Sequence, residues 1–350
     1  MFKIYFKQFV AVLALAALVL GSVSCRALAT GEFYGNTTPP SENILRYVTG
    51  DEPESLDPQG TTGQPEYRIF MALYEGLVDY HPKTMEPIPA IAERWHVNND
   101  SSEVVFHLRK NARWSNGDPI TANDFVYSLR RGLSPEVASR NANLAYYINY
   151  APAYNSGDVF VQDPQTRQFL LEQDFADEAS PAAASAEPLS RKPLKPAEQE
   201  YQPSEVEPTS NPDTPFHEFM HSPARLTLSG DEKQRNKLLG SNAKMQAAVA
   251  GKEFVKVKGE DLGVEAVDDY TVRISLSQPA PFFAGLLANP FFRLVPRKAV
   301  EQYGEQWTEP AHIMTCGPFK LKSWKPYAEI VVERDPMYWD AASVKLDRIY

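Results

Sequence analysis

The sequence predicts a mixed α/β fold, because strand patterns and helix patterns alternate along both flanks of the 350-residue chain. Residues 103–109 alternate apolar and polar side chains, which is typical of a half-buried strand. Residues 121–129 begin with a Thr followed three residues later by an Asp, the pattern of a helix capping box, and continue with apolar residues at helical spacing. Residues 263–267 and 271–276 predict a hairpin around Asp268-Asp269.

The middle of the chain differs in composition from its flanks. Residues 179–215 are rich in Pro, Ala, Glu and Ser and have almost no large apolar side chains. Such a segment cannot bury enough apolar surface to offset the entropy lost on ordering. We therefore expect residues 162–250 to be a low-complexity, largely disordered insertion, with partial order at 169–175 and 231–250. It divides the predicted folded region into residues 44–161 and 251–350.

Residues 1–25 have the three-part organisation of a secretory signal peptide. Lys3 and Lys7 precede an apolar run at residues 9–20, and small residues follow. The run is shorter than the roughly 20 residues that a membrane-spanning helix needs. Two cleavage modes remain open: processing before Cys25, which would then be lipidated as in bacterial lipoproteins, or ordinary cleavage after the A-x-A motif that ends at Ala29. In either case residues 26–43 read as a flexible tether.

Charge and cysteine content exclude several classes of protein. The net charge of −10 argues against nucleic acid as a partner. With Cys25 and Cys316 as its two cysteines, the fold does not depend on disulfides. The six histidines are scattered along the sequence, so no metal site is predicted. Neither a phosphate-binding loop nor a nucleophile elbow occurs, and we expect no cofactor and no enzymatic activity.

An ordered series of short motifs allows a more specific comparison of the sequence with known protein families. The motifs are residues 52–58 (EPESLDP), 73–78 (LYEGLV), 106–110 (FHLRK), 112–125 (ARWSNGDPITANDF), 262–266 (LGVEA), 303–310 (YGEQWTEP), 317–319 (GPF) and 338–339 (YW). Together they resemble the extracytoplasmic solute-binding proteins of bacterial ABC importers, in the oligopeptide- and dipeptide-binding family (family 5). The resemblance covers most of residues 44–157 and 254–350.

The resemblance implies a periplasmic-binding-protein type II-like clamshell, of which this sequence contains only the first-lobe portion. It implies binding of an extended peptide for uptake by an ABC transporter. The implied partners are the peptide and the permease–ATPase complex, and the membrane is contacted through a lipid anchor only. The protein would act as a monomer in the periplasm or at the extracytoplasmic membrane face, lipid-anchored or secreted.

The resemblance also implies a set of ligand-binding residues. The loop after the SLDP motif lines the cleft in the family, and here it contributes Thr62, Gly63 and Gln64. Asn141 matches a cleft-side position that is aromatic in some relatives, and Cys316 matches a position near the cleft. The alternative for Thr62–Gln64 is a plain turn without a binding role. The alternative for Cys316 is a buried core residue.

Three other functions stay open. The chain could be a truncated or degenerate solute-binding fragment with a sensing or scaffold role. It could bind another ligand of the family, such as nickel or haem. It could also be an extracytoplasmic thiol hydrolase that uses Cys316 with His312, although the sequence shows no third residue to orient such a pair.

Overall fold

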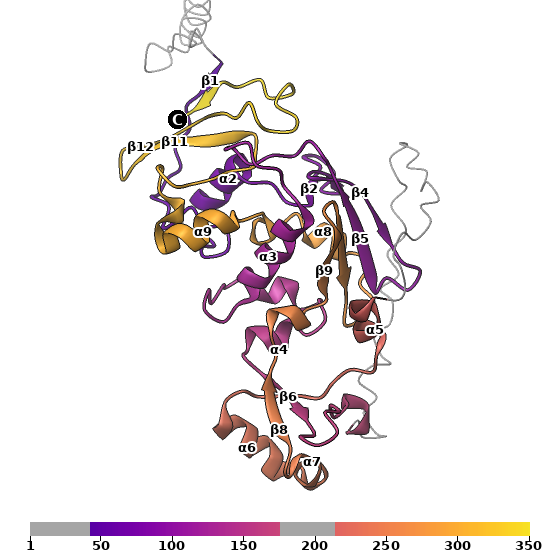
Figure 1. The fold of residues 1–350 in the computed structure, drawn as a ribbon. Coiled ribbons are helices and arrows are strands. Elements are labelled where there is room, and N and C mark those ends of the chain that lie inside the picture. The colour runs from indigo at the N-terminus through magenta and orange to yellow at the C-terminus, as the bar shows by residue number, and fades with distance from the viewer. Residues whose placement is uncertain (1–42, 176–213) are drawn as a thin grey trace, which may run out of the picture. The chain divides into compact units, whose positions relative to one another are not determined.

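The computed structural model describes residues 43–175 and 214–350 (Figure 1). The predicted signal peptide, Cys25 and all of the predicted tether except residue 43 lie outside the described residues. The described residues from position 44 onward belong to one compact unit. Within the described ranges, no helix has both the length and the apolar content needed to cross a membrane.

Helices and strands alternate along the chain, which confirms the predicted mixed α/β class. The helices are α2 (Gln64–Leu73), α3 (Ala122–Leu133), α4 (Ala151–Asn155), α5 (Pro215–His221), α6 (Glu232–Ser241), α7 (Ala243–Val249), α8 (Phe283–Leu286) and α9 (Arg297–Tyr303). The strands are β1 (Ile44–Leu45), β2 (Val78–Tyr80), β3 (Pro87–Pro89), β4 (Ala92–Val97), β5 (Glu103–Leu108), β6 (Val159–Gln162), β7 (Thr227–Leu228), β8 (Glu253–Lys256), β9 (Val264–Asp268), β10 (Thr271–Ser275), β11 (Phe319–Lys325), β12 (Glu329–Arg334) and β13 (Arg348–Ile349).

A four-stranded sheet in the order β4-β5-β10-β9 lies against the main hydrophobic core. Strands β9 and β10 form the hairpin that the sequence predicts. On the core face, Val104 pairs with Ile274 and Phe106 with Val272, and all four side chains are buried. Strands β5 and β10 come from opposite sides of the middle segment in the sequence. Their pairing therefore joins the two predicted parts of the domain.

Helix α3 covers this sheet by packing against β9 and β10. Its capping box forms as predicted, because the Asp124 carboxylate accepts hydrogen bonds from the Thr121 backbone N–H at 2.8 Å and from its hydroxyl at 3.2 Å. Phe125 and Leu129, at helical spacing on one face, are 2% and 5% exposed. The helix therefore has a fixed start and a buried face, which makes it a firm support for the segments packed on it.

A second four-stranded sheet, in the order β1-β13-β12-β11, joins the first and last described segments. Strand β1 pairs in parallel with β13, and Tyr47 N–H donates to the Tyr350 carbonyl at 2.9 Å. Figure 1 accordingly shows residue 350 lying beside β1. Helix α2 packs against β11 of this sheet.

The middle of the chain contains a third sheet, in the order β7-β6-β8, which α6 and α7 accompany (Figure 1). A small hydrophobic cluster includes Val161, Leu228, Leu239 and Val249. The expectation of a largely disordered insertion at 162–250 is therefore wrong for residues 162–168 and 214–230, which fold with β6. Residues 169–175 and 231–250, for which partial order is expected, are ordered and include the helices α6 and α7. The apolar stretches that complete the cluster are too short to stand out in the composition. Residues 176–213, which hold most of the low-complexity segment, lie outside the described residues.

Arg225 connects this middle unit to the preceding segment. Its guanidinium carbon lies 3.9 Å from the ring centroid of Phe169 and 4.3 Å from that of Phe219. Its backbone N–H donates to the Tyr150 hydroxyl at 3.1 Å. Phe160, 1% exposed, packs edge-on to Tyr150. These cation–π and aromatic contacts fasten the described residues after position 213 to α4 and β6.

This packing predicts that Phe160→Ala destabilises the protein by about 3–5 kcal/mol, because the substitution leaves a cavity among aromatic side chains. Urea denaturation measures the loss, and amide exchange should show reduced protection in β7 and β8. Phe254→Ala is the matched control, since Phe254 lies in the same sheet but is 40% exposed; its cost should stay below about 1 kcal/mol. Equal losses for the two variants would contradict a folded middle unit.

Candidate functional site

The predicted cleft loop leads directly into α2, which begins at Gln64. Gly63 is the N-cap residue, and Pro65 lies in the first turn, where its missing N–H costs no helical hydrogen bond. The side chains of Thr62 and Gln64 are exposed. The loop therefore presents two polar side chains and a glycine at the N-terminal end of a helix.

Gly63 is required by a buried carboxylate. A Cβ at this position would lie 1.9 Å from Oε2 of Glu66, a residue that is 3% exposed. The other oxygen of Glu66 accepts a hydrogen bond from the Glu54 N–H at 2.9 Å. Any larger residue at position 63 would displace either this carboxylate or the loop. The glycine thus lets the backbone of the loop come close to the Glu66 carboxylate.

An ion pair anchors the start of the loop to α3. The Arg131 guanidinium donates to both carboxylate oxygens of Asp57, at 2.6 and 3.2 Å, and to Oε1 of Gln59 at 2.6 Å. The amide of Gln59 donates in turn to the Ser128 carbonyl at 2.7 Å. Both charged side chains are mostly buried, with 16% and 13% exposed. A bidentate, partly desolvated pair of this kind fixes direction as well as distance.

Asn141 is brought to the same place by a side-chain hydrogen bond. Its Nδ2 donates to the Tyr67 hydroxyl at 2.9 Å, across 74 residues of sequence. Tyr67 lies three residues after Gln64, so both side chains project from the same face of α2. The structure thus groups four predicted residues with Tyr67. We call Thr62, Gly63, Gln64, Tyr67 and Asn141 the α2 N-terminal patch.

Tyr67 is the member of the patch that the sequence analysis missed. The signal was its helical spacing from Gln64, but the link to Asn141 depends on the packing of two distant segments. All five residues of the patch are uncharged, so the patch offers hydrogen bonds and close backbone approach rather than a charge to bind.

Cys316 does not belong to this patch. Its backbone N–H donates to the Leu73 carbonyl at 3.0 Å, which places it at the opposite end of α2. The residue is 2% exposed, and its Sγ accepts a hydrogen bond from the Glu75 N–H at 3.3 Å. Burial raises the pKa of the thiol well above its ordinary value. We therefore correct the expectation that Cys316 is a ligand-binding residue: it is part of the core.

His312, the proposed partner of Cys316 in a thiol hydrolase, makes other contacts. Its ring stacks on Tyr303 with the ring centroids 3.9 Å apart, and its Nδ1 lies 3.1 Å from the Gln306 carbonyl oxygen. A catalytic cysteine needs an accessible thiolate next to a base. The burial of the thiol and the separate contacts of the imidazole do not provide that arrangement.

A buried polar network surrounds Glu75, two residues beyond the end of α2. Its two carboxylate oxygens accept hydrogen bonds from the Tyr338 hydroxyl at 2.7 Å and from the Trp339 indole at 2.6 Å. The Arg109 guanidinium lies 3.8 Å from the Trp339 ring centroid. Burial raises the pKa of Glu75 to about 7, although these hydrogen bonds and Arg293 favour the charged form.

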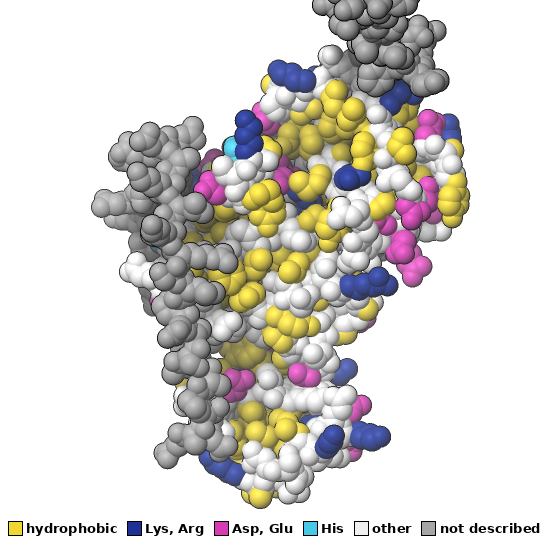
Figure 2. All heavy atoms as spheres, turned by 180° about the vertical axis from the view of Figure 1, so that it is seen from behind, with side chains coloured by type: hydrophobic (Ala, Val, Ile, Leu, Met, Phe, Trp, Pro, Cys, Tyr) yellow, Lys and Arg dark blue, Asp and Glu magenta, His cyan; other side chains and the backbone are white. Residues whose placement is uncertain are grey.

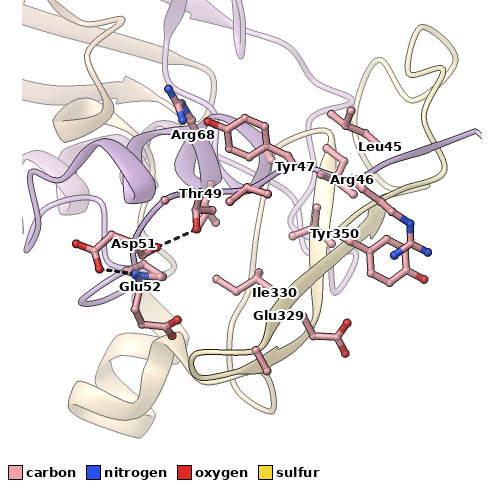
Figure 3. Close-up of a pocket in the computed structure, with 18 of the residues that line it drawn as sticks. Leu45, Arg46, Tyr47, Thr49, Asp51, Glu52, Arg68, Glu329, Ile330 and Tyr350 are labelled. Carbon is pink, nitrogen blue, oxygen red and sulfur yellow. Dashed lines mark hydrogen bonds between the residues drawn. The ribbon is translucent and has the colours of Figure 1, made fainter. Parts of the chain in front are cut away.

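A groove of about 900 Å³ lies elsewhere on the compact unit (Figure 3). It is lined by residues 45–53, by Arg68, Ile69 and Ala72 of α2, and by β12, the β11–β12 turn and residues 349–350. The Glu52 carboxylate holds the turn in place by accepting hydrogen bonds from the Trp324 indole at 2.8 Å and the Tyr327 N–H at 2.9 Å. None of the predicted ligand-binding residues, all of which the structure describes, lines this groove.

Part of the groove lining is apolar and exposed. Val48 is 86% exposed and Tyr327 is 90% exposed, while Leu45 and Tyr47 are each 43% exposed. The space-filling view also shows groups of exposed hydrophobic side chains on the face that it presents (Figure 2). In residues 43–175 and 214–350, no group of three or more His, Cys, Asp or Glu side chains is placed to hold a metal ion.

Comparison with known proteins gives one consistent family. Residues 86–350 match the model of the bacterial extracellular solute-binding proteins, family 5. The chain is 30% identical over 338 residues to the periplasmic oligopeptide-binding protein OppA of Salmonella typhimurium, covering 95% of this chain and 44% of OppA. It is 27% identical to the periplasmic murein peptide-binding protein MppA of Escherichia coli, covering 95% of this chain and 43% of MppA.

Solved structures show the same likeness. The unliganded open form of the murein tripeptide-binding protein MppA matches with a TM-score of 0.58 and 26% identity, over 89% of this chain and 41% of that one. Haemophilus influenzae OppA in complex with the peptide RPPGFSPFR matches in fold, with a TM-score of 0.57 and 23% identity. The chain thus spans less than half the length of the relatives that it matches.

The anchor of the loop predicts a cost for Asp57→Asn. The substitution removes the negative charge and leaves the largely buried Arg131 without its ionic partner, so we expect a loss of about 2 kcal/mol in unfolding free energy. Chemical denaturation measures this loss. Glu93→Gln is the control, because the Glu93–Arg94 pair is exposed and should contribute less than about 0.5 kcal/mol. Similar small losses in both variants would show that the Asp57–Arg131 pair does not anchor the loop.

The Glu75 network predicts a pH-dependent stability. Burial raises the pKa of Glu75 from 4.5 to about 7 in the folded state, so the folded protein holds this proton more tightly than the unfolded chain does. The contribution of Glu75 to stability is complete below about pH 4.5, falls as the pH rises to about 7 and is constant above that. The fall should be on the order of 3 kcal/mol.

Glu75→Gln keeps the shape of the side chain but removes the titration. The stability of wild type relative to this variant should therefore decrease between pH 4.5 and 7, as measured by urea denaturation across that range. Tyr338→Phe removes a hydrogen bond that favours the charged carboxylate, so it should move the transition to higher pH. Parallel pH profiles for wild type and Glu75→Gln would refute the assignment.

Proposed function

This chain belongs to the bacterial extracellular solute-binding proteins of family 5, and from that premise we propose that it binds peptides for uptake by an ABC transporter. The observation that carries the proposal is the α2 N-terminal patch. Its polar, uncharged side chains and its glycine suit the main chain of an extended peptide, which offers N–H and C=O groups at regular intervals. The relatives from Salmonella typhimurium and Escherichia coli are named as oligopeptide- and murein peptide-binding proteins.

The proposed mechanism is non-covalent binding of the peptide, with no chemical reaction. Gly63 allows the peptide backbone to approach the loop, and Thr62 and Gln64 supply hydrogen-bonding side chains on the exposed side. The ion pair between Asp57 and Arg131 holds the loop on α3 before the ligand binds. This restraint lowers the entropic cost of binding. Because the patch has no charged member, we expect it to tolerate many peptide sequences.

The remaining parts of the proposal concern compartment and partners. We place the protein in the periplasm or at the extracytoplasmic membrane face, as a monomer that delivers its ligand to a permease and ATPase complex. The anchor would be the lipidated Cys25, or the chain would be released after Ala29. Because the chain spans 44% of OppA, we expect further ligand contacts to come from outside the matched region.

A buried Cys316 disfavours the thiol hydrolase, since its thiol is both covered and held in the neutral form. The protein is therefore proposed as a binding protein and not as an enzyme. A sensing or scaffold role predicts the same fold without peptide binding, so a direct binding measurement separates the two.

Nuclear magnetic resonance titration of the isotopically labelled chain with a mixture of alanine-rich tripeptides to pentapeptides tests the proposal. We expect amide shifts concentrated at residues 60–67 and 139–142. Gly63→Ala should abolish these shifts, because its Cβ would meet the Glu66 carboxylate. Gly285→Ala is the matched control, as nothing lies within 4 Å of the Cβ position there. Absence of shifts at millimolar peptide, or shifts confined to the groove of Figure 3, would contradict the proposed site.

A further inference from the structure

We propose that Tyr67 and Asn141 act as a donor and acceptor pair that binds the backbone N–H and C=O of a single residue in an extended ligand. The inference rests on the proposed function, because it takes the ligand to be a peptide. It assigns a specific task to two residues of the α2 N-terminal patch: this position recognises main chain, whatever the side chain of the bound residue.

The hydrogen bond between the two side chains leaves one donor and one acceptor. The Tyr67 oxygen accepts from Asn141 Nδ2 at 2.9 Å, so the hydroxyl hydrogen of Tyr67 points to another acceptor. Asn141 Oδ1 keeps its capacity to accept. In the part of the chain that the structure describes, the 2.9 Å contact is the hydrogen bond that these two side chains make. The pair therefore presents an O–H and a C=O side by side.

The Tyr67 ring and the Asn141 backbone are each supported by neighbouring residues. The Tyr67 ring lies against Phe70, with the centroids 6.3 Å apart, and Phe70 is fully buried. The Asn141 backbone carbonyl accepts a hydrogen bond from the Leu144 N–H at 3.0 Å, which fixes the start of the short 3₁₀ helix Ala142–Ala145. The hydrogen bond to Tyr67 then restrains the Asn141 side chain itself, and restraint of this kind before binding favours affinity.

The pair matches the geometry of an extended chain. In a strand, the N–H and C=O of one residue point to the same side. A neighbouring antiparallel strand hydrogen-bonds to them with one acceptor and one donor. Tyr67 and Asn141 offer those two groups from side chains. Both residues are half-buried while Gln64 and Thr62 are exposed, so the pair is partly open to solvent and lies deeper in the patch than the two exposed side chains.

The alternative is a purely structural hydrogen bond that holds the segment around Asn141 on α2. Another tyrosine–asparagine bond in the chain provides the comparison: Tyr146 donates to Asn155 Oδ1 at 2.7 Å, and neither residue belongs to the patch. Tyr146→Phe also removes a tyrosine hydroxyl that is bonded to an asparagine, although here the tyrosine is the donor, and it leaves the residues of the proposed site unchanged. It is therefore the matched control for Tyr67→Phe.

The test compares wild type, Tyr67→Phe and Tyr146→Phe by titration with alanine peptides and with leucine-substituted peptides, alongside thermal denaturation. We expect Tyr67→Phe to weaken binding roughly three- to thirty-fold for every peptide alike, because a ligand carbonyl loses its donor. Tyr146→Phe should change affinity by less than about twofold, whatever its effect on stability. Unchanged affinity in Tyr67→Phe, or losses that track stability in both variants, would overturn the inference.

A second measurement addresses Asn141. Asn141→Leu removes the acceptor, so the variant should no longer distinguish a peptide from the analogue in which an ester replaces the amide at the bound residue. Wild type should prefer the amide, and an equal preference in wild type and variant would contradict the pairing. If wild type binds no peptide at all, the proposed function itself fails; if it binds and the variants behave as wild type, only this inference fails.

Discussion

The carboxylate of Glu75 is the constraint on which the arrangement of the molecule depends. It is buried, and it accepts hydrogen bonds from Tyr338 and Trp339, 263 and 264 residues further along the chain. A buried carboxyl group without hydrogen-bond partners would be destabilising in this position, so the two donors favour closure of the core. The network therefore holds the segment that follows β12 close to the C-terminal end of α2. The sheet that contains β1 and β13 is held there with it.

Helix α2 is consequently fixed at both ends by buried carboxyl groups. Just beyond its C-terminal end the carboxyl group of Glu75 is bonded by Tyr338 and Trp339, while the Glu75 backbone N–H donates to the Cys316 thiol. At its N-terminal end Glu66 packs on Gly63. The ion pair between Asp57 and Arg131 adds the link to α3. A helix restrained in this way can present a loop with little freedom, which is what a binding site with weak individual contacts requires.

The same architecture separates Cys316 from the α2 N-terminal patch. The reactive-looking residue, Cys316, lies in the core, while the polar uncharged residues lie on the accessible end of α2. The groove in Figure 3 is a third environment, with exposed apolar side chains next to the paired ends of β1 and β13. The accessible features on the described residues are thus polar hydrogen-bonding groups at the start of α2 and exposed apolar side chains in the groove.

The sequence by itself determined the fold class, the family and the local elements whose signals are short-range. The capping box at Thr121 and the β9–β10 hairpin each depend on residues within a few positions of one another, so spacing suffices to predict them. The loop at Gly63 is expected from the family resemblance that the motifs carry. Tertiary structure decided what depends on contacts across the chain: the order in the middle segment, the burial of Cys316 and the pairing of Asn141 with Tyr67. Burial and long-range hydrogen bonds depend on which distant segments pack together, and local composition carries no record of that.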